Sequence, residues 1–291
     1  MIKVSVTTET NEQVFAAISS PAPDIVYLDG GFSNPADWQT MCMRAHESGK
    51  RCGLRLPSIW RTEAERFFAA HAKALFDAGF DALLIGSIEN LGFLKRHGVT
   101  LPLVFDSSVY DYNGFAERMI DQFLQQADLS HSFPENMPDQ NARPPRIQTL
   151  PQELSQRELS RLSEELYARG TEAELIVYSR TRMMTTAQCV RRTTLCCDKH
   201  PVTMELVDRT GAHLPVKNCC RFCENRIYNA VPTFLIDQKQ ALTTVRHSYE
   251  RCDFTTESAE AVKHILRCYE MPDQAVLPRE FTRGAWKRGI A

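Results

Sequence analysis

No stretch of this sequence approaches the roughly 18 consecutive apolar residues that a membrane-spanning helix needs. The opening residues, MIKVSVTTETNEQVF, also lack the basic start and apolar core of a secretory signal. The 34 lysines and arginines nearly balance the 36 aspartates and glutamates, so the formal net charge of -2 gives no global field that attracts nucleic acid, although a local basic patch is compatible with it. The composition predicts a soluble, cytoplasmic protein with no membrane span.

Disulfide scaffolds are also excluded, because ten cysteines in 291 residues are far below the density of small secreted domains. Four are scattered along the chain and are typical of small buried side chains: Cys42, Cys52, Cys252 and Cys268. The other six fall in one segment: Cys189, Cys196, Cys197, Cys219, Cys220 and Cys223. A reducing compartment would keep most of them as thiols, so their crowding needs a chemical reason.

Short apolar runs alternate with amphipathic stretches before the cysteine segment, a pattern typical of βα units around a parallel sheet. No G-x-G-x-x-G motif follows the first run, which favours a TIM-like (β/α) barrel over a dinucleotide-binding sheet. Helices are predicted between the runs, for example at 61–79, with Gly79 at its end, and at 155–170, with Ser155 as N-cap. The predicted strands are Ile2–Thr7, Asp24–Gly30, Arg51–Pro57, Asp81–Ser87, Leu101–Ser108, Arg146–Pro151 and Ala173–Arg180.

We expect one barrel domain over the whole chain, residues 1–291. Residues 125–145 are rich in proline, asparagine, aspartate and glutamine, which predicts a long surface loop. Residues 182–229 are expected to form a cysteine-rich segment within the barrel. The run PTFLID at 232–237 and a helix at 258–270 are predicted to supply the closing elements.

Reacting groups of such barrels gather at the carboxyl ends of the strands. Each residue at such a position could equally be a structural group with satisfied partners. The candidates are Asp29, Arg55, Asp106, Ser107, Glu153 and Arg180.

The thiols are organised in pairs. Cys220 and Cys223 form a C-x-x-C, a spacing that lets two thiolates face one metal centre. Cys189 with Cys196 or Cys197 would complete four soft ligands, for which iron and zinc are equally suitable. A thioredoxin-like redox pair is less favoured because the motif opens no helix in a compact βαβ unit, and six free thiols are less favoured because adjacent thiols oxidise readily.

Several motifs together resemble those of peptidase family U32, the collagenase-like peptidases. The resemblance covers nearly the whole chain and is most specific between Glu153 and Asn229. The family's fullest signature has a further cysteine where this chain has Arg182. The motifs are DIVYLDGGFS at 24–33, TLPQELSQRELSRL at 149–162, AELIVYSRTRMMTTAQC at 173–189, ELVDRTGAHLPV at 205–216 and CRFCENRIYN at 220–229.

The resemblance implies a four-iron, four-sulfur cluster on a TIM-like barrel, as in relatives that take part in oxygen-independent hydroxylation of RNA bases or of a quinone-precursor ring. The short members of the family suggest Cys189, Cys196, Cys220 and Cys223 as its ligands, with Cys197 and Cys219 as substitutes if the adjacent cysteine is not the ligand. Substrates would then be RNA or a small aromatic molecule.

Two other functions stay open. The family name implies proteolysis, although the sequence has neither a G-x-S-x-G nor an H-E-x-x-H motif. The chain could instead be a non-catalytic, zinc-binding partner in a heterodimer with a longer relative. Four arginines could bind a phosphate or carboxylate group of a substrate, because guanidinium groups pair well with such anions: Arg55, Arg180, Arg182 and Arg209. Alternatively, they could form ion pairs at the rim of the barrel, for example Arg209 with Asp208 or Glu205.

Overall fold

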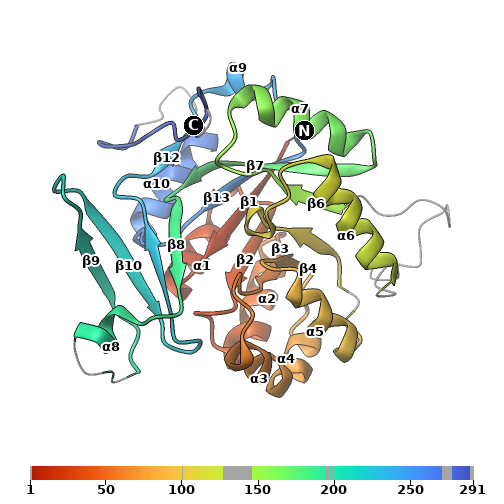
Figure 1. The fold of residues 1–291 in the computed structure, drawn as a ribbon, viewed down its shortest axis with the longest axis vertical. Coiled ribbons are helices and arrows are strands. Elements are labelled where there is room, and N and C mark those ends of the chain that lie inside the picture. Colours follow the sequence, from red (N-terminus) through yellow and green to blue (C-terminus); the bar gives the residue numbers. More distant parts are fainter. Residues whose placement is uncertain are drawn as a thin grey trace.

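Eight parallel strands close into a barrel in the computed structural model, which describes residues 2–99, 101–126, 146–194, 197, 199–270 and 277–288 (Figure 1). Each strand pairs in parallel with the next, and the last one, β13, pairs with both β7 and β1. The barrel strands are β1 (Lys3–Thr8), β2 (Ile25–Asp29), β3 (Arg51–Arg55), β4 (Ala82–Ile85), β5 (Leu103–Phe105), β6 (Arg146–Thr149), β7 (Thr171–Ser179) and β13 (Tyr249–Asp253). This confirms the predicted TIM barrel, including all seven strands read before the cysteine segment.

Helices surround the barrel, as Figure 1 shows. Helix α7 begins as predicted, because Ser155 and Glu158 form a reciprocal capping box at its first turn. The helix predicted at 61–79 is two helices, α3 and α4, separated at His71, and Gly79 follows them with a φ of +83°. The helices are α1 (Asn11–Ser19), α2 (Trp38–Glu47), α3 (Thr62–Ala70), α4 (Ala72–Asp77), α5 (Glu89–His97), α6 (Gly114–Gln126), α7 (Gln156–Tyr167), α9 (Lys239–Leu242) and α10 (Ala259–Glu270), with short 3-10 turns η1 (Pro35–Asp37) and η2 (Ser107–Val109).

The alternation of side chains along the strands divides the core in two. One set of residues packs outward against the helices, as Val26 and Leu28 do beside Trp38. The other set fills the barrel interior with a smaller apolar cluster: Ile25, Tyr27, Ala82, Leu84 and Val104. Gly53 is required at its place in β3, because a Cβ there would overlap the ring of Tyr27.

The strand that closes the barrel is not the one expected. The run at 232–237 contributes β12 (Thr233–Phe234), which pairs antiparallel with β7 outside the ring of eight. The closing strand is β13, whose sequence YERCD does not read as an apolar run because Arg251 and Asp253 point into the barrel and carry charge. Of the predicted loop at 125–145, residues 125–126 end α6, and 127–145 lie outside the described residues.

The cysteine-rich segment forms a second, antiparallel sheet inserted between β7 and β13, in the strand order β8-β11-β10-β9. Figure 1 shows it beside the barrel, at the left of the view. Its elements are β8 (Arg182–Thr186), α8 (Val190–Thr194), β9 (Thr203–Val207), β10 (His213–Cys219) and β11 (Glu224–Tyr228). Within the described residues, none of the helices has the length and apolar character needed to cross a membrane.

Candidate functional site

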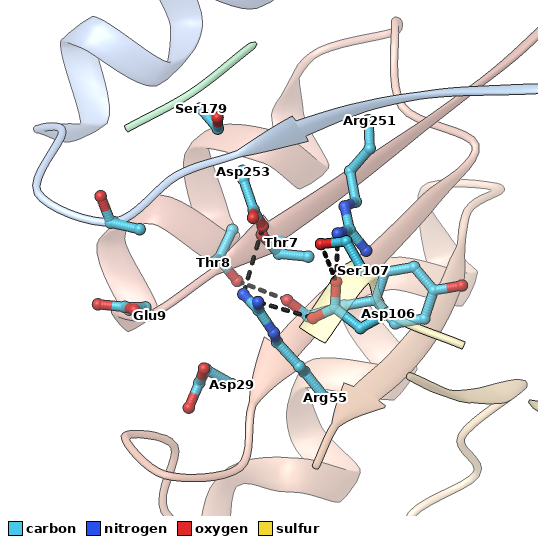
Figure 2. A network of polar contacts seen from close by, with 12 residues as sticks. Thr7, Thr8, Glu9, Asp29, Arg55, Asp106, Ser107, Ser179, Arg251 and Asp253 are labelled. Atoms are coloured by element: carbon cyan, nitrogen blue, oxygen red, sulfur yellow. Dashed lines mark hydrogen bonds and ion pairs between the residues drawn. The ribbon is translucent and has the colours of Figure 1, made fainter. Parts of the chain in front are cut away.

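The carboxyl ends of the barrel strands carry a connected set of buried ion pairs (Figure 2). Arg55, at the end of β3, lies between two carboxylates: its Nη2 atom is 2.7 Å from Asp106 Oδ2 and its Nη1 atom is 3.3 Å from Asp253 Oδ1. Thr7 donates a further hydrogen bond to Asp253. The sequence predicts Arg55 and Asp106 at this end of the barrel but not Asp253, because its strand is not recognised.

Arg251 of β13 extends this network into the barrel. Its Nη2 atom is 2.6 Å from Asp106 Oδ1, and its Nη1 atom is 3.1 Å from Glu174 Oε2. Glu174 also accepts hydrogen bonds from Ser5 and Thr149, at 2.5 and 2.6 Å. Burial alone would raise the pKa of Asp106, but the neighbouring arginines hold this pKa well below its ordinary value. These buried ion pairs share their partners and form a floor at the mouth of the barrel.

Two other predicted residues at the strand ends already have partners. The Ser107 hydroxyl lies 3.3 Å from Asp106 Oδ1 and donates to it. Glu153 is hydrogen-bonded to Tyr112, and burial together with the Glu153 charge raises the pKa of that tyrosine to about 12. Both residues line the barrel mouth without a free reacting group of their own.

Asp29 lies at the end of β2, where a reacting group is expected, but its side chain forms a structural ion pair with the inserted sheet. Its Oδ2 atom is 2.6 Å from Nη1 of Arg226, a residue of the inserted sheet. The same guanidinium contacts Glu9 at 3.4 Å and Glu224 at 3.1 Å, and Tyr228 donates to Glu9 at 2.8 Å. All five side chains are buried, so Asp29 fastens the insertion to the barrel.

The four candidate arginines have different surroundings. Arg55 is held as described, and Arg180 donates from Nη1 to the carbonyls of Asn229, at 3.1 Å, and Ala230. Arg209 is exposed on the turn between β9 and β10, away from the mouth. Arg182 lies at the mouth, and none of the described residues forms a hydrogen bond or close ion pair with its guanidinium.

The alternative expected for Arg209, an ion pair with Asp208 or Glu205, is not present either. Asp208 accepts hydrogen bonds from the backbone of Thr210, at 2.7 Å, within its own turn. Glu205 lies 2.9 Å from the ring of His213 across the β9–β10 ladder.

A polar pocket of about 80 Å³ opens above the ion pairs. Strand β8 contributes Arg182 to its wall, β11 contributes Tyr228, and the segment after β13 contributes Thr255. The full lining is Arg55, Ser107, Ser108, Tyr110, Gln152, Glu153, Arg180, Thr181, Arg182, Tyr228, Asp253 and Thr255.

The C-x-x-C lies in the turn between β10 and β11 and is clamped to the barrel from behind. Phe222 is buried against Phe67 and Phe68, with ring centroids 5.7 and 6.1 Å away. Arg221 donates to the carbonyls of Gly30 and Ser33, at 3.1 and 2.6 Å. The two middle residues of the motif therefore hold the turn in place, while its two cysteines line a cavity on its other side.

Cys189 approaches the same turn through a pair of asparagines. Asn218 of β10 donates to the Cys189 sulfur at 3.7 Å and also to the side-chain oxygen of Asn225. Asn225 in turn donates to the carbonyl of Gln188 at 2.7 Å. These contacts tie the loop after β8 to the hairpin, and an amide donor beside a sulfur is the kind of support that thiolate metal sites use.

Three of the four expected ligands, Cys189, Cys220 and Cys223, line one cavity of about 580 Å³, and Cys197 lines it as well. The fourth, Cys196, lies outside the described residues. In the part of the chain that the structure describes, no three Cys, His, Asp or Glu side chains are already positioned to hold a metal ion.

Cys219 also borders this cavity, but its thiol is engaged elsewhere. Its sulfur donates to the carbonyl of Gly31 at 3.3 Å, and burial raises its pKa to about 12. Of the two substitutes considered, Cys197 is therefore better suited than Cys219 to ligate a metal as a thiolate.

The thiol cavity and the mouth pocket share no lining residue. Strand β11 connects them, because Glu224 lines the first and Tyr228 the second. At about 3.3 Å per residue, Glu224 and Tyr228 are roughly 13 Å apart along this strand. A metal centre in the thiol cavity would thus lie near the mouth pocket without opening into it.

No family model and no curated protein matches this chain significantly. Solved structures with similar folds include an uncharacterized B. cereus protein (10% identity, TM-score 0.45, 91% of this chain and 64% of that one), of whose length the chain spans less than two thirds. Others are a putative fructose-1,6-biphosphate aldolase from Coccidioides immitis (10%, 0.44, 95% and 81%) and 2,3-dimethylmalate lyase (10%, 0.44, 97% and 87%). The protein has the TIM-barrel fold, and the strand pairing described above defines it.

Proposed function

We propose that this protein is an iron–sulfur enzyme of the U32 type, with a four-iron, four-sulfur cluster held by Cys189, Cys196, Cys220 and Cys223. The observation that carries the proposal is the cavity into which the described members of this set converge from two distant loops. Thiolates are the ligands that such clusters use. The Asn218 contact to Cys189 and the clamped C-x-x-C turn support a site that is held in shape by its surroundings.

The reaction that we propose is oxygen-independent hydroxylation of RNA or of a small ring substrate. With water as the oxygen source, a C–H bond and one water molecule give a C–OH group, two protons and two electrons. When bound, the cluster can pass these electrons singly to an external one-electron acceptor. The separation between the thiol cavity and the mouth pocket suits electron transfer better than direct bonding of the substrate to the cluster.

The chain's own residues would bind and orient the substrate at the barrel mouth. The buried pairs of Arg55 with Asp106 and Asp253 keep the floor of the pocket fixed. Arg180 and Arg182 border the space above it. A rigid floor with cationic walls favours a substrate that carries a negative group.

Metal analysis of anaerobically purified protein tests the proposal. We expect iron and acid-labile sulfide in equal amounts and an absorption band near roughly 400 nm. Cys223→Ala should lose most of the iron, whereas Cys42→Ala, a change at a buried position of α2, should keep it. Stoichiometric zinc without iron would refute the cluster and favour the zinc-binding partner. Cleavage of casein or gelatin, abolished by chelation, would instead favour a peptidase.

A further inference from the structure

The Arg182 side chain at the barrel mouth stands out from the other buried or half-buried cations. Arg55, Arg226 and Arg251 each contact at least two carboxylates within 3.5 Å. Arg182 has no such partner among the described residues and lies close enough to Arg55 and Arg226 that they disfavour its charge. Burial and these two neighbours lower its pKa. Asp106 and Tyr228 attract this cation, but no described carboxylate lies within ion-pair distance of its guanidinium.

Two more donors facing the same pocket are unused. The Nε atom of Arg180 is buried and makes no hydrogen bond within the described residues; Glu257 Oε1 lies 4.0 Å away. The hydroxyl of Thr255, likewise buried, has no partner there either. Unpaired buried donors are costly, and these two lie beside Arg182 in the wall of one pocket, which favours a ligand that accepts hydrogen bonds.

The carboxylates in the wall of the pocket do not supply this acceptor. Asp253 is held by Arg55 and Thr7, and Glu153 is bonded to Tyr112. Arg182 therefore borders the pocket without a close internal anion. An oxyanion, either carboxylate or phosphate, has the charge and the lone pairs that the three groups lack.

An apolar cavity of about 370 Å³ adjoins the mouth pocket. The two share Gln152, Glu153 and Thr181 in their walls. Alternation along β8 explains their division, because Arg182 lines the polar pocket and Met183, the next residue, lines the apolar cavity. The apolar side chains around this cavity are Leu150, Leu154, Leu159, Leu175, Ile176, Met183, Leu235, Ala285 and Trp286.

We propose that the barrel mouth binds a small organic acid, with its oxyanion on Arg182 and its apolar part in the adjoining cavity. This inference deepens the function proposed above and rests on it for the role of the bound acid as substrate. It narrows the substrate class from RNA or a ring compound to an amphipathic acid.

Calorimetric titration of the protein tests the site with four probes. We expect 4-butylbenzoate to bind at least tenfold more tightly than its uncharged amide, because the amide cannot pair with Arg182. It should also bind at least tenfold more tightly than acetate, because acetate leaves the apolar cavity empty. Phenyl phosphate in place of benzoate distinguishes a preference for phosphate from one for carboxylate.

Arg182→Gln should weaken 4-butylbenzoate binding at least tenfold, and Arg182→Lys less. Arg209→Gln is the matched control, because it removes an exposed arginine outside the mouth, and it should bind like the wild type. Circular dichroism melting of each variant shows that the fold is intact. Equal binding of 4-butylbenzoate by Arg182→Gln and the wild type would overturn the proposal. It would also be overturned if the protein bound a short RNA oligonucleotide through Arg182 but did not bind 4-butylbenzoate.

The same titration, run beside iron analysis on anaerobically purified protein, separates this inference from the cluster. Iron content reports on the thiol cavity, and acid binding reports on the mouth. Protein without iron that still binds 4-butylbenzoate through Arg182 would refute the cluster and keep the acid site. Protein with a full cluster that fails to bind would do the reverse.

Discussion

The guanidinium of Arg226, in the inserted sheet, lies 2.6 Å from the carboxylate of Asp29, at the end of a barrel strand. Both side chains are buried, and Glu9 and Glu224 share the same cation. Burial alone would raise the pKa of Asp29, but Arg226 and Arg55 lower it. This one arginine therefore neutralises much of the negative charge where the two sheets of the protein meet.

Replacing that arginine should be among the most damaging single changes in the protein. Arg226→Met keeps the apolar stem but leaves buried carboxylates without their partner, so we expect a loss of about 3–5 kcal/mol in the free energy of unfolding. Urea denaturation followed by circular dichroism measures it. Arg161→Gln is the control: its pair with Glu165 is exposed at the surface, and its loss should change stability by about 0.5 kcal/mol or less. Similar losses of unfolding free energy in the two variants would contradict a stabilising role of Arg226 between the barrel and the inserted sheet.

A second buried carboxylate, Asp111, should make stability depend on pH in the opposite sense to Asp29. Neither of its oxygens has a hydrogen-bond partner among the described residues, and burial raises its pKa to about 6. The folded protein then binds this proton more tightly than the unfolded chain does, so stability should fall as pH rises from about 4 to about 6, by about 3 kcal/mol in total.

Asp111→Asn removes this titration. The variant should match the wild type near pH 4 and exceed it at pH 7, with the difference developing between these values. Urea unfolding at several pH values measures both curves. The pKa values of Asp29 and Asp106 are lowered, so these groups affect stability only below about pH 4. They therefore do not change the difference expected between pH 4 and pH 7. Parallel curves for the two proteins would show that Asp111 is not the titrating group.

Metal-free protein should show unequal reactivity among the clustered thiols. With a pKa of about 12, Cys219 is only about one part in ten thousand thiolate at pH 8, and its sulfur is buried against Gly31. Cys223 is exposed. Iodoacetamide followed by mass spectrometry should therefore label Cys223 at least a hundredfold faster than Cys219. Rapid labelling of Cys219 in folded protein would return it to the set of candidate ligands.

The clamp behind the C-x-x-C turn should matter for metal content as well as for stability. Phe222→Ala removes a buried ring that packs on Phe67 and Phe68, which should cost about 3–5 kcal/mol. Because the turn would lose its anchor, we expect less iron per protein under conditions in which the fold persists. Phe76→Ala, at an exposed position of α4, is the matched control and should retain its iron. Full iron content in folded Phe222→Ala would show that the C-x-x-C turn does not need the contact of Phe222 with the barrel helix to bind metal.

The sequence predicts most of the barrel because its first seven strands are apolar runs bounded by turns and helices. It does not reveal β13, because the inward side chains of that strand, Arg251 and Asp253, are charged and interrupt the apolar pattern. A polar barrel interior hides a strand from any reading based on hydrophobic periodicity.

Spacing likewise suggests which cysteines pair but not what holds them. The C-x-x-C and Cys189 are visible in the sequence, whereas the Asn218 and Asn225 contacts that join them depend on the register of β10 and β11. Asp29 was placed at the barrel mouth from its strand position, and its actual partner, Arg226, lies 197 residues further along the chain. Contacts of this range follow from topology rather than from local pattern.

The inserted sheet precedes β13 in the chain, and β13 is the strand that bridges β7 and β1. During synthesis on the ribosome, all the cysteines of the C-x-x-C hairpin emerge before the strand that seals the ring. If the proposed cluster is present, its ligands on the hairpin are thus available before the ring closes, so cluster loading could precede closure.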